Sequence, residues 1–371
     1  MWTLARKNLL NQRARLVISI GGVAFAVALM ILLRGLYLAY EHKVGDFYNA
    51  MDVNAWVVQK GSADMLHSYS VLPSSMESRL GRIDGVTQVI PYMARELGFK
   101  LGGRDVVLYV AGFEPAASEP GPGPLHMESG TRAIGDDDII VDRVFAHRND
   151  LRVGDHLRIL GNDLRVAGIS SGGDVVMFQY GFVTNHRAST LLQSKNLVNA
   201  YLLRYAPGTD PATAAASVTK KFPDTLVKSV PDVVKENERI VKEGFLPVLG
   251  VLLVIGFCVG VAVIGLTIYS AVLEHRREYG VLKALGARPR QMLGVVAVQA
   301  IGAAAAGYVA GIVASLLAAR AAEVWVPQFI TRIQFTDVAL VGVAALLMGL
   351  IAAAIPMRSI VSVDAAVVFR S

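Results

Sequence analysis

Apolar residues are gathered into four long blocks, and the stretch between the first two blocks has the mixed pattern of a folded, water-exposed domain. The blocks cover residues 16–40, 246–272, 292–319 and 338–355. A helix of about 18 residues or more crosses the roughly 30 Å of hydrocarbon in a bilayer. We therefore predict an integral membrane α-helical protein with four transmembrane helices and a large domain, residues 41–244, inserted between the first and the second.

Short β-rich runs alternate with short helical runs in residues 41–244, which predicts an α+β domain. A Pro/Gly-rich stretch at 115–124 is expected to be a loop, and residues 161–163 are expected to be the turn of a hairpin. The expected strands are 53–58, 86–90, 106–112, 138–141, 154–160 and 164–169, and the expected helices are 72–82, 143–149, 211–221 and 233–242.

Basic residues flank the apolar blocks. Residues 41–244 hold 22 Lys or Arg and 25 Asp or Glu, whereas the remaining 167 residues hold 14 and 5. A nucleic-acid-binding protein would carry its basic face on the folded domain, so the net charge of +6 does not indicate one. Because basic loops stay in the cytoplasm, we expect segments 1–15, 273–291 and 356–371 there, with 41–244 and the short loop 320–337 outside.

The first block could also be a secretory signal peptide, because basic residues precede it. Signal peptides have an apolar region of only about 7–15 residues that ends at a small-x-small cleavage site. Block 16–40 is longer and has no convincing cleavage site. We therefore interpret it as a retained transmembrane helix.

The sequence has no motif for catalysis or metal binding. It contains no P-loop, no G-x-S-x-G and no H-E-x-x-H, and none of its seven histidines stands at a metal-ligand spacing from another ligand type. The three aspartates at 136–138 admit a cation site, but we interpret them as a solvated turn. The lone Cys258 is interpreted as a small packing residue. We expect no catalytic residue, no bound metal and no cofactor in this chain.

Small residues recur every four positions in two of the apolar blocks. Such rows allow helix backbones to approach closely in lipid, although a chain rich in Gly and Ala produces some of them by composition alone. The predicted helix-packing positions are Gly256, Gly260, Gly307, Gly311 and Ser315.

Arg34 stands well inside the first apolar block. A charge in the bilayer is costly and usually faces protein or a wet cavity. We expect its helix face to line a lateral mouth for an amphipathic substrate at the outer leaflet; the alternative is an arginine that snorkels to the lipid headgroups. The predicted mouth residues are Met30, Arg34, Tyr37, Leu38, Tyr40 and Glu41. Haem is a substrate that this face permits, with ligands drawn from Met30, Tyr40, Glu41 and His42.

Residues 273–291 have the pattern of a stiff helical projection from the membrane. Glu274 and Glu278 lie one turn apart, where like charges repel, so a basic partner surface would be favourable. Gly280 permits a sharp turn, and Gly286 suits the end of a short helix. A docking partner is implied by exposed apolar side chains at Val281, Leu282 and Leu285.

The stretch 274–287, EHRREYGVLKALGA, resembles the coupling helix of the FtsX/MacB-type permeases of ABC transporters. The pattern of that family is E-x(3,4)-E-[aromatic or aliphatic]-G-x-L-[KR]-A-[LI]-G-A. Residues 138–169 resemble the family's periplasmic core domain, and the order of one span, a large domain and three spans is also the family's.

Both ends of the chain agree with this resemblance. Residues 4–9 with Arg13 and Arg15 resemble the amphipathic N-terminal helix of the family, which would occupy 1–15. The tail 356–371 resembles the family's P-x-R-x-A-x(3)-D-P-x(3)-L-R ending, from which it departs at Ser359-Ile360 and at Ala365.

The resemblance implies a non-catalytic permease subunit of type VII ABC architecture in a bacterial cell membrane, with both termini cytoplasmic. The implied partners are a dimer of separate ATPase subunits that bind ATP and Mg, a second permease copy or sister permease, and in some members a periplasmic adaptor or other extracytoplasmic protein. The implied ATPase-coupling residues are Glu274, Glu278, Tyr279, Gly280, Val281, Leu282, Lys283, Leu285 and Gly286.

The layout is similar to that of the small DevC- and HrtB-like permeases. We therefore expect the chain to transmit ATP-driven motion to its external domain and so to export or extract a lipophilic or amphipathic substrate. The alternative is an FtsX-like relay that activates an extracytoplasmic partner by mechanotransmission and transports nothing.

Overall fold

The computed structural model describes residues 13–62, 70–115, 121–173, 179–274, 278, 281, 289–325 and 331–361. The chain forms two compact units: Tyr40–Glu243 is one, and Met1–Ala39 with Gly244–Ser371 is the other. Both division points fall inside helices, namely α2 (Arg13–Asn49) and α7 (Val230–Glu274). Residues 1–12, where most of the predicted N-terminal helix lies, and the tail after Val361 are outside the described residues.

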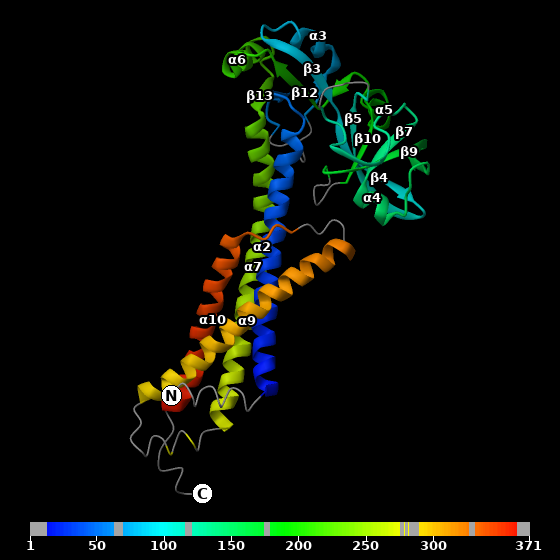
Figure 1. Cartoon of the computed structure of the whole chain (residues 1–371). Coiled ribbons are helices and arrows are strands. Elements are labelled where there is room, and N and C mark those ends of the chain that lie inside the picture. The colour runs from blue at the N-terminus through cyan, green and yellow to red at the C-terminus, as the bar shows by residue number, and fades with distance from the viewer. Residues whose placement is uncertain are drawn as a thin grey trace. The chain divides into compact units, whose positions relative to one another are not determined.

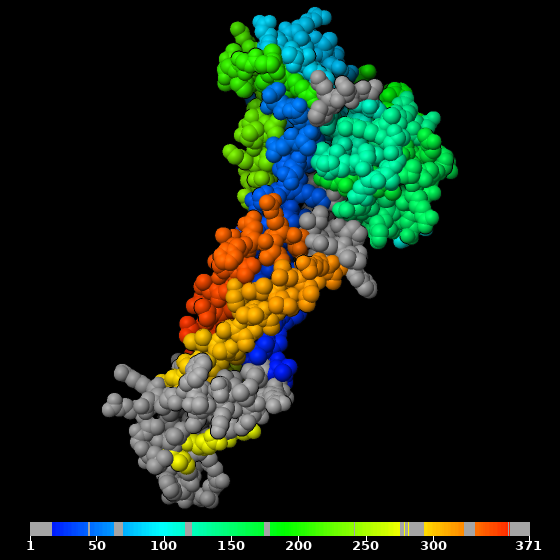
Figure 2. Space-filling view, viewed as in Figure 1, coloured from blue at the N-terminus to red at the C-terminus, as the bar shows by residue number. Residues whose placement is uncertain are grey.

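The membrane unit is built from long apolar helices. Besides the parts of α2 and α7 that belong to it, it contains α9 (Pro289–Trp325) and α10 (Phe335–Val361), which pack against each other (Figures 1 and 2). Among the described residues, four helices are long and apolar enough to cross a membrane. The predicted class, four such helices with a large α+β domain between the first and second, is confirmed.

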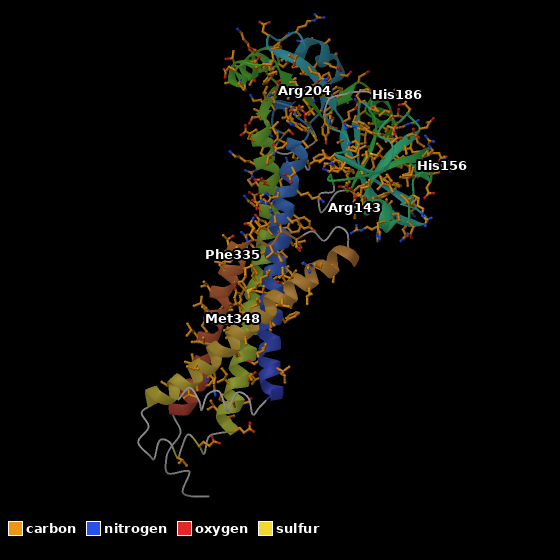
Figure 3. The ribbon with its side chains drawn as sticks, viewed as in Figure 1. Arg143, His156, His186, Arg204, Phe335 and Met348 are labelled. Atoms are coloured by element: carbon orange, nitrogen blue, oxygen red, sulfur yellow. The ribbon has the colours of Figure 1, made fainter. Side chains whose placement is uncertain are left out.

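Glycines allow these helices to pack closely. A Cβ atom added to Gly307 of α9 would lie 2.5 Å from Val23 Cβ, and one added to Gly311 would lie 2.6 Å from Val27 Cγ1, both on α2. On α7, a Cβ at Gly260 would lie 2.5 Å from the sulfur of Met348 on α10 (Figure 3). Because real Cβ atoms do not approach so closely, a side chain at Gly307 or Gly311 would require α2 to shift, whereas one at Gly260 would require the flexible Met348 side chain to move.

The other two predicted packing positions have looser surroundings. A Cβ at Gly256 would meet only Leu29, at 3.8 Å, which is ordinary van der Waals contact. Ser315 is 1% exposed, and its hydroxyl donates to the carbonyl of Ile312 at 2.8 Å within the same helix. Cys258 is exposed on α7, so its interpretation as a packing residue is wrong.

The external unit contains two main sheets. The first is antiparallel with strand order β13-β1-β12-β3, and the second has order β4-β5-β10-β7-β9-β6, with β8 paired to β9. In the second sheet, β10 runs parallel to β5 and β7 runs parallel to β9. The strands are β1 (Ala55–Gln59), β3 (Val86–Tyr92), β4 (Ala94–Leu101), β5 (Arg104–Phe113), β6 (His126–Gly130), β7 (Asp138–Asp142), β8 (His156–Ile159), β9 (Asn162–Ser171), β10 (Tyr180–Thr184), β12 (Ala200–Tyr205) and β13 (Thr225–Ser229).

Short helices and one small strand pair complete this unit (Figure 1). Three of the helices start at polar side chains that accept a hydrogen bond from a free backbone N–H: Asp142, Thr184 and Asp210. The remaining elements are the pair β2 (Leu72–Pro73) and β11 (Leu197–Val198), the 3-10 turn η1 (Ser74–Met76), and helices α3 (Glu77–Leu80), α4 (Arg143–Arg148), α5 (Asn185–Leu191) and α6 (Pro211–Lys221).

Aromatic side chains fill the core between the end of α2 and the sheets. Trp56 of β1 is fully buried, with its ring 5.6 Å from that of Tyr48 and 5.2 Å from that of Tyr92. Phe47 lies 4.8 Å from Tyr180 of β10. The same buried cluster includes Val230 and Val233, so the last turns of α2 and the first turns of α7 share one core with both sheets.

Several expected elements differ in the structure. Segment 72–82 is a short strand, a 3-10 turn and one turn of α-helix, because Leu72 and Pro73 pair with β11. The hairpin turn is Leu160-Gly161, both with positive φ, and Ile159 pairs directly with Asn162; two such residues form the tight turn that hairpins favour. The expected helix 233–242 is the beginning of the 45-residue α7, and β4 and β13 were not anticipated.

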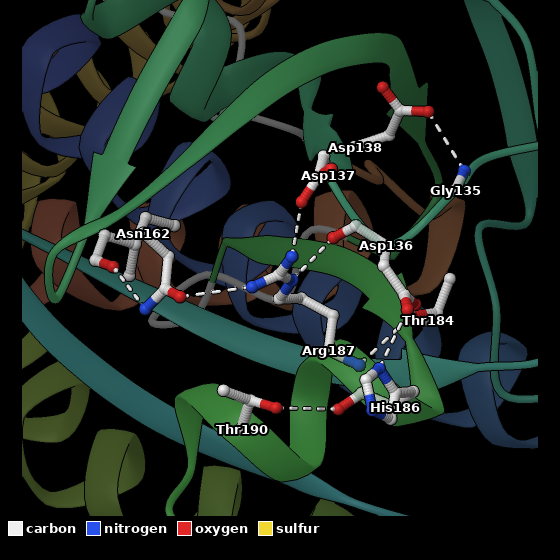
Figure 4. Close-up of polar contacts among 10 residues, drawn as sticks. Gly135, Asp136, Asp137, Asp138, Asn162, Thr184, His186, Arg187 and Thr190 are labelled. Atoms are coloured by element: carbon white, nitrogen blue, oxygen red, sulfur yellow. Dashed lines mark hydrogen bonds and ion pairs between the residues drawn. The ribbon is translucent and has the colours of Figure 1, made fainter.

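The three aspartates at the start of β7 have protein partners (Figure 4). The carboxylate of Asp136 accepts a hydrogen bond from the hydroxyl of Thr184 and contacts Nδ1 of His186 at 2.8 Å. The backbone carbonyl of Asp136 accepts a hydrogen bond from Nε of Arg187 at 2.6 Å. Asp138 contacts Arg165 Nε at 2.9 Å. The interpretation as a purely solvated turn is therefore wrong for Asp138, whose side chain is only 13% exposed.

These contacts set the protonation behaviour of two carboxyl groups. The Thr184 hydrogen bond, with help from His186, lowers the pKa of Asp136 against the effect of burial. Burial acts to raise the pKa of Asp138, but hydrogen bonds from Arg165 and from the Gly135 N–H outweigh it and the pKa is lowered. A carboxyl group whose pKa is lower in the folded chain than in the unfolded chain stabilises the fold at pH values above its unfolded-state pKa of about 3.9. This stabilisation is lost as the pH falls through the folded-state pKa.

We predict that Asp138→Asn lowers the melting temperature of the chain by a few degrees at pH 7 and reduces its loss of stability below about pH 4, because the ionisable partner of Arg165 is gone. Thermal unfolding in detergent across this pH range measures both effects. Asp137→Asn is the control, since that side chain is 87% exposed and surface pairs contribute little. Equal pH profiles for Asp138→Asn and the unmodified chain would contradict the prediction.

A second prediction concerns the helix crossings. Gly311→Ala should destabilise the membrane unit by about 1–3 kcal/mol, because the added Cβ overlaps Val27 and the Ala24 carbonyl of α2. Gly302→Ala, on the same helix, is the matched control because no neighbouring atom lies within 4 Å of its added Cβ. Thermal stability in detergent, followed by size-exclusion chromatography, compares the two; similar melting curves would show that the crossing is not tight.

Candidate functional site

Two charged side chains from different helices meet within the membrane unit. Nε of Arg34 on α2 donates to Oδ1 of Asp337, in the first turn of α10, at 2.8 Å. The Arg34 side chain is 37% exposed and that of Asp337 only 8%. The guanidinium carbon of Arg34 also lies 5.3 Å from the ring centre of Tyr37, one turn further along α2. An arginine within a span is thus stabilised by an acidic partner and by an aromatic face.

Sequence reasoning missed this pairing. Asp337 was assigned to the short loop 320–337, but it belongs to the first turn of α10. The two residues are 303 positions apart. The signal that could have found the pair is their complementarity: one basic and one acidic side chain, each near the same end of a predicted span.

An apolar cavity of about 300 Å³ lies beside the ion pair. Three helices contribute its walls: α2 through Met30 and Arg34, α7 through Leu253, Val254 and Phe257, and α10 through Asp337, Leu340, Val341 and Ala344. This volume is at the lower end of the range for ligand pockets in proteins. Its position in a helix bundle, with one ion pair in an otherwise apolar wall, suits a small lipophilic group.

Two of the six predicted mouth residues, Met30 and Arg34, line this cavity. Tyr37, Leu38 and Tyr40 are less than 9% exposed and are not among its lining residues. Glu41 belongs to the external unit, where it contacts Lys242 of α7 at 2.8 Å. The four candidate haem ligands are accordingly in different surroundings, because His42 is exposed and Glu41 is paired.

The segment before α10 lies against α2 next to Arg34. The N–H of Arg332 donates to the carbonyl of Gly35 at 2.9 Å. A Cβ added to Gly35 would lie 3.3 Å from Ile333 and 3.5 Å from the carbonyl oxygen of Arg332, so glycine permits the close approach. The Arg332 residue is exposed. The hydrogen bond from Arg332 to Gly35 places the backbone of the segment before α10 beside Arg34.

The predicted ATPase-coupling residues are only partly described. Helix α7 ends at Glu274, and Glu274, Glu278 and Val281 are exposed. Tyr279, Gly280, Leu282, Lys283, Leu285 and Gly286 lie outside the described residues. Their coupling role remains a prediction.

The acidic cluster of the external unit is bonded to protein groups. Asp136 and Asp137 contact Thr184, His186 and Arg187 (Figure 4). Asp138 contacts Arg165. Within the described residues, no group of three or more His, Cys, Asp or Glu side chains is arranged to hold a metal ion.

Two family models match the chain. The model for the MacB-like periplasmic core domain matches residues 16–221, and the model for the FtsX-like permease C-terminal region matches residues 250–365. The first alone covers more than half of the 371 residues.

Curated relatives match along nearly the whole chain. One uncharacterized ABC transporter permease of Mycobacterium tuberculosis is 24% identical over 368 residues, which is 96% of each chain. A second from the same organism is 24% identical over 377 residues, 98% of each chain. A crystal structure of the periplasmic region of MacB from Actinobacillus actinomycetemcomitans has a TM-score of 0.39 at 11% identity and covers 51% of this chain and 94% of that one.

The two matches together account for the observed architecture. The periplasmic core domain corresponds to the unit inserted between the first and second long helices, and the FtsX-like region corresponds to the three helices that follow. Such a subunit works with an ATPase partner and is not itself an enzyme. The chain belongs to the FtsX-like permeases of ABC transporters that carry a MacB-like periplasmic core domain.

Proposed function

We propose that this permease couples ATP hydrolysis by its partner to the export or extraction of a lipophilic or amphipathic molecule. The observation that supports transport is the apolar cavity of about 300 Å³ in the membrane unit. A subunit that only relays a signal has no need for such a cavity. A transporter needs a place where an apolar group leaves the lipid, and this cavity offers one.

The cavity is well situated to respond to helix movement. Its walls come from α2, α7 and α10, so any change in the spacing of these helices alters its volume. Both α2 and α7 are continuous from the membrane unit into the external unit. We propose that movement of the ATPase subunits, received by the segment 273–291 after α7, changes this spacing and expels the bound molecule.

The complex would contain two ATPase subunits and either a second copy of this chain or a sister permease. We propose that segment 273–291 docks on the ATPase through its acidic and apolar residues, represented among the described residues by the exposed Glu278 and Val281. With segments 1–15 and 356–371 it would be cytoplasmic, and 41–244 with 320–337 would be extracytoplasmic. A periplasmic adaptor or another extracytoplasmic protein would be a further component.

The docking proposal predicts that Glu278→Lys combined with Leu282→Asp detaches the ATPase or uncouples it, because the change reverses a charge and removes an apolar contact. Co-purification of the ATPase and ATP-dependent activity of the reconstituted complex measure this. The variant should retain the thermal stability of the unmodified chain. Normal co-purification together with normal activity would show that the segment is not the docking element.

The transport proposal predicts that Ala344→Phe abolishes stimulation of ATP hydrolysis by lipophilic compounds, because the ring occupies the cavity. Basal hydrolysis should persist. Val343→Phe is the matched control, since its side chain is on the adjacent position, is 56% exposed and does not line the cavity. The measurement is ATPase activity of the complex in nanodiscs with a panel of lipids, drugs and haem.

Two outcomes would contradict transport through this cavity. One is full stimulation of the Ala344→Phe complex by the same compounds. The other is an unmodified complex that no lipophilic compound stimulates but that an extracytoplasmic protein does, which would establish the relay function instead.

A further inference from the structure

We propose that the cavity beside Arg34 binds the apolar chain of an anionic amphiphile and that Arg34 binds its carboxylate or phosphate group. The inference rests on the proposed export function and adds the chemical class of the ligand. Three observations support it: the apolar walls of the cavity, the hydrogen-bonding capacity of Arg34 that no described residue uses, and the burial of Asp337 beside a partly exposed Arg34.

The walls accept a hydrocarbon chain and little else. Apart from Arg34 and Asp337, every lining side chain is apolar. Met30 is 4% exposed and Val341 6%, whereas Leu340 is 66% exposed and Val254 62%, so the cavity has a buried floor and an open side. Such walls can pack against a hydrocarbon chain, whereas a polar group there would lack partners.

Arg34 has donors to spare. A guanidinium group carries five N–H donors. Among the residues that the structure describes, only Asp337 accepts a hydrogen bond from Arg34, and it does so through Oδ1 alone, since Asp337 Oδ2 has no partner there. The Arg34 side chain is 37% exposed. Its remaining donors are therefore available to an external anion, and charge-assisted bonds to carboxylate or phosphate are the strong ones.

The ion pair presents its cation and not its anion. The side chain of Asp337 is 8% exposed and its Oδ2 is buried, whereas the side chain of Arg34 is 37% exposed. A headgroup at this end of the cavity therefore meets the guanidinium group, which attracts an anion and repels an ammonium group.

The test uses the full-length chain in phosphatidylcholine nanodiscs without ATPase. Cys258→Ala removes the native thiol, and Ala344→Cys introduces one in the cavity wall. The rate at which a membrane-permeant maleimide alkylates this thiol is measured with decanoate, decyl phosphate, decanol or decylamine. These probes share one chain and differ in the headgroup, so any difference between them reports on the charged end of the site.

Decanoate, decyl phosphate or both should protect the thiol at concentrations about tenfold below those required of decanol, because hydrogen bonds between a guanidinium group and a charged acceptor are stronger than those to a neutral hydroxyl. Decylamine should protect least. Protection by only one anion would identify the headgroup as carboxylate or phosphate. Equal protection by all four compounds, or strongest protection by decylamine, would overturn the proposal.

Charge variants make the assignment specific. The double change Arg34→Gln with Asp337→Asn keeps the pair neutral and should remove most of the anion preference. Asp337→Asn alone should increase that preference, because Arg34 then has no counter-charge. The control is Arg320→Gln, because Arg320 is exposed on α9 and does not line the cavity. This change should leave the anion preference unchanged. A preference that survives the double change would overturn the assignment to Arg34.

The outcome can be separated from that of the export proposal. If decanoate or decyl phosphate protects the thiol with the expected preference but does not stimulate ATP hydrolysis in the full complex, the binding site is correct and export of this class is wrong. If a lipophilic compound stimulates hydrolysis while protection shows no anion preference, export is supported and the headgroup assignment is wrong.

Discussion

A charge inside a lipid-facing helix bundle has to be paired, and the contact between Arg34 and Asp337 meets this requirement. The contact joins α2 to the first turn of α10, so the position of one helix constrains the other. The carboxylate at the N-terminal turn of α10 is also favoured by the helix dipole. Replacing either partner alone would leave a charge without compensation in an apolar setting, a cost much larger than that of a surface pair.

The cavity depends on the spacing of the helices in the membrane unit, which differs along their length. At Gly307 and Gly311 the α9 backbone comes close to α2, and at Gly260 α7 comes close to Met348. Leu253 and Phe257 of α7 pack against the same core and also line the cavity. The helices pack closely at the glycines and leave a space near Arg34. The walls of this space are apolar because they consist of transmembrane helices.

The pattern of apolar blocks was sufficient to predict four spans and an inserted α+β domain. The thickness of the bilayer sets the length of an apolar block, and a half-buried strand produces alternating apolar and polar residues. Helix ends were predicted less well. Hydropathy falls after Tyr40 but α2 continues to Asn49, since hydropathy reflects the surroundings of a residue and not its backbone conformation. Strand β4 was missed because adjacent Arg95 and Glu96 and the glycine at 98 break the alternation.

The candidate site was only half predictable. Arg34 stood out as a charge in an apolar run, which is a local signal. Asp337 did not, because its pairing depends on which helices are neighbours, and nothing within a single sequence states that. The same limit applies to the cavity: Ala344 and Phe257 are ordinary apolar residues until the fold brings them together.

The shared aromatic core of the external unit has a mechanical consequence. Phe47 and Tyr48 at the end of α2 and Val230 and Val233 at the start of α7 are buried in one cluster, and Glu41 and Lys242 join the same two helices at the edge of that unit. Sliding one helix along the other would expose that cluster to water. The shared core thus holds the end of α2 and the start of α7 together, so a displacement carried by either helix would reach both sheets at once.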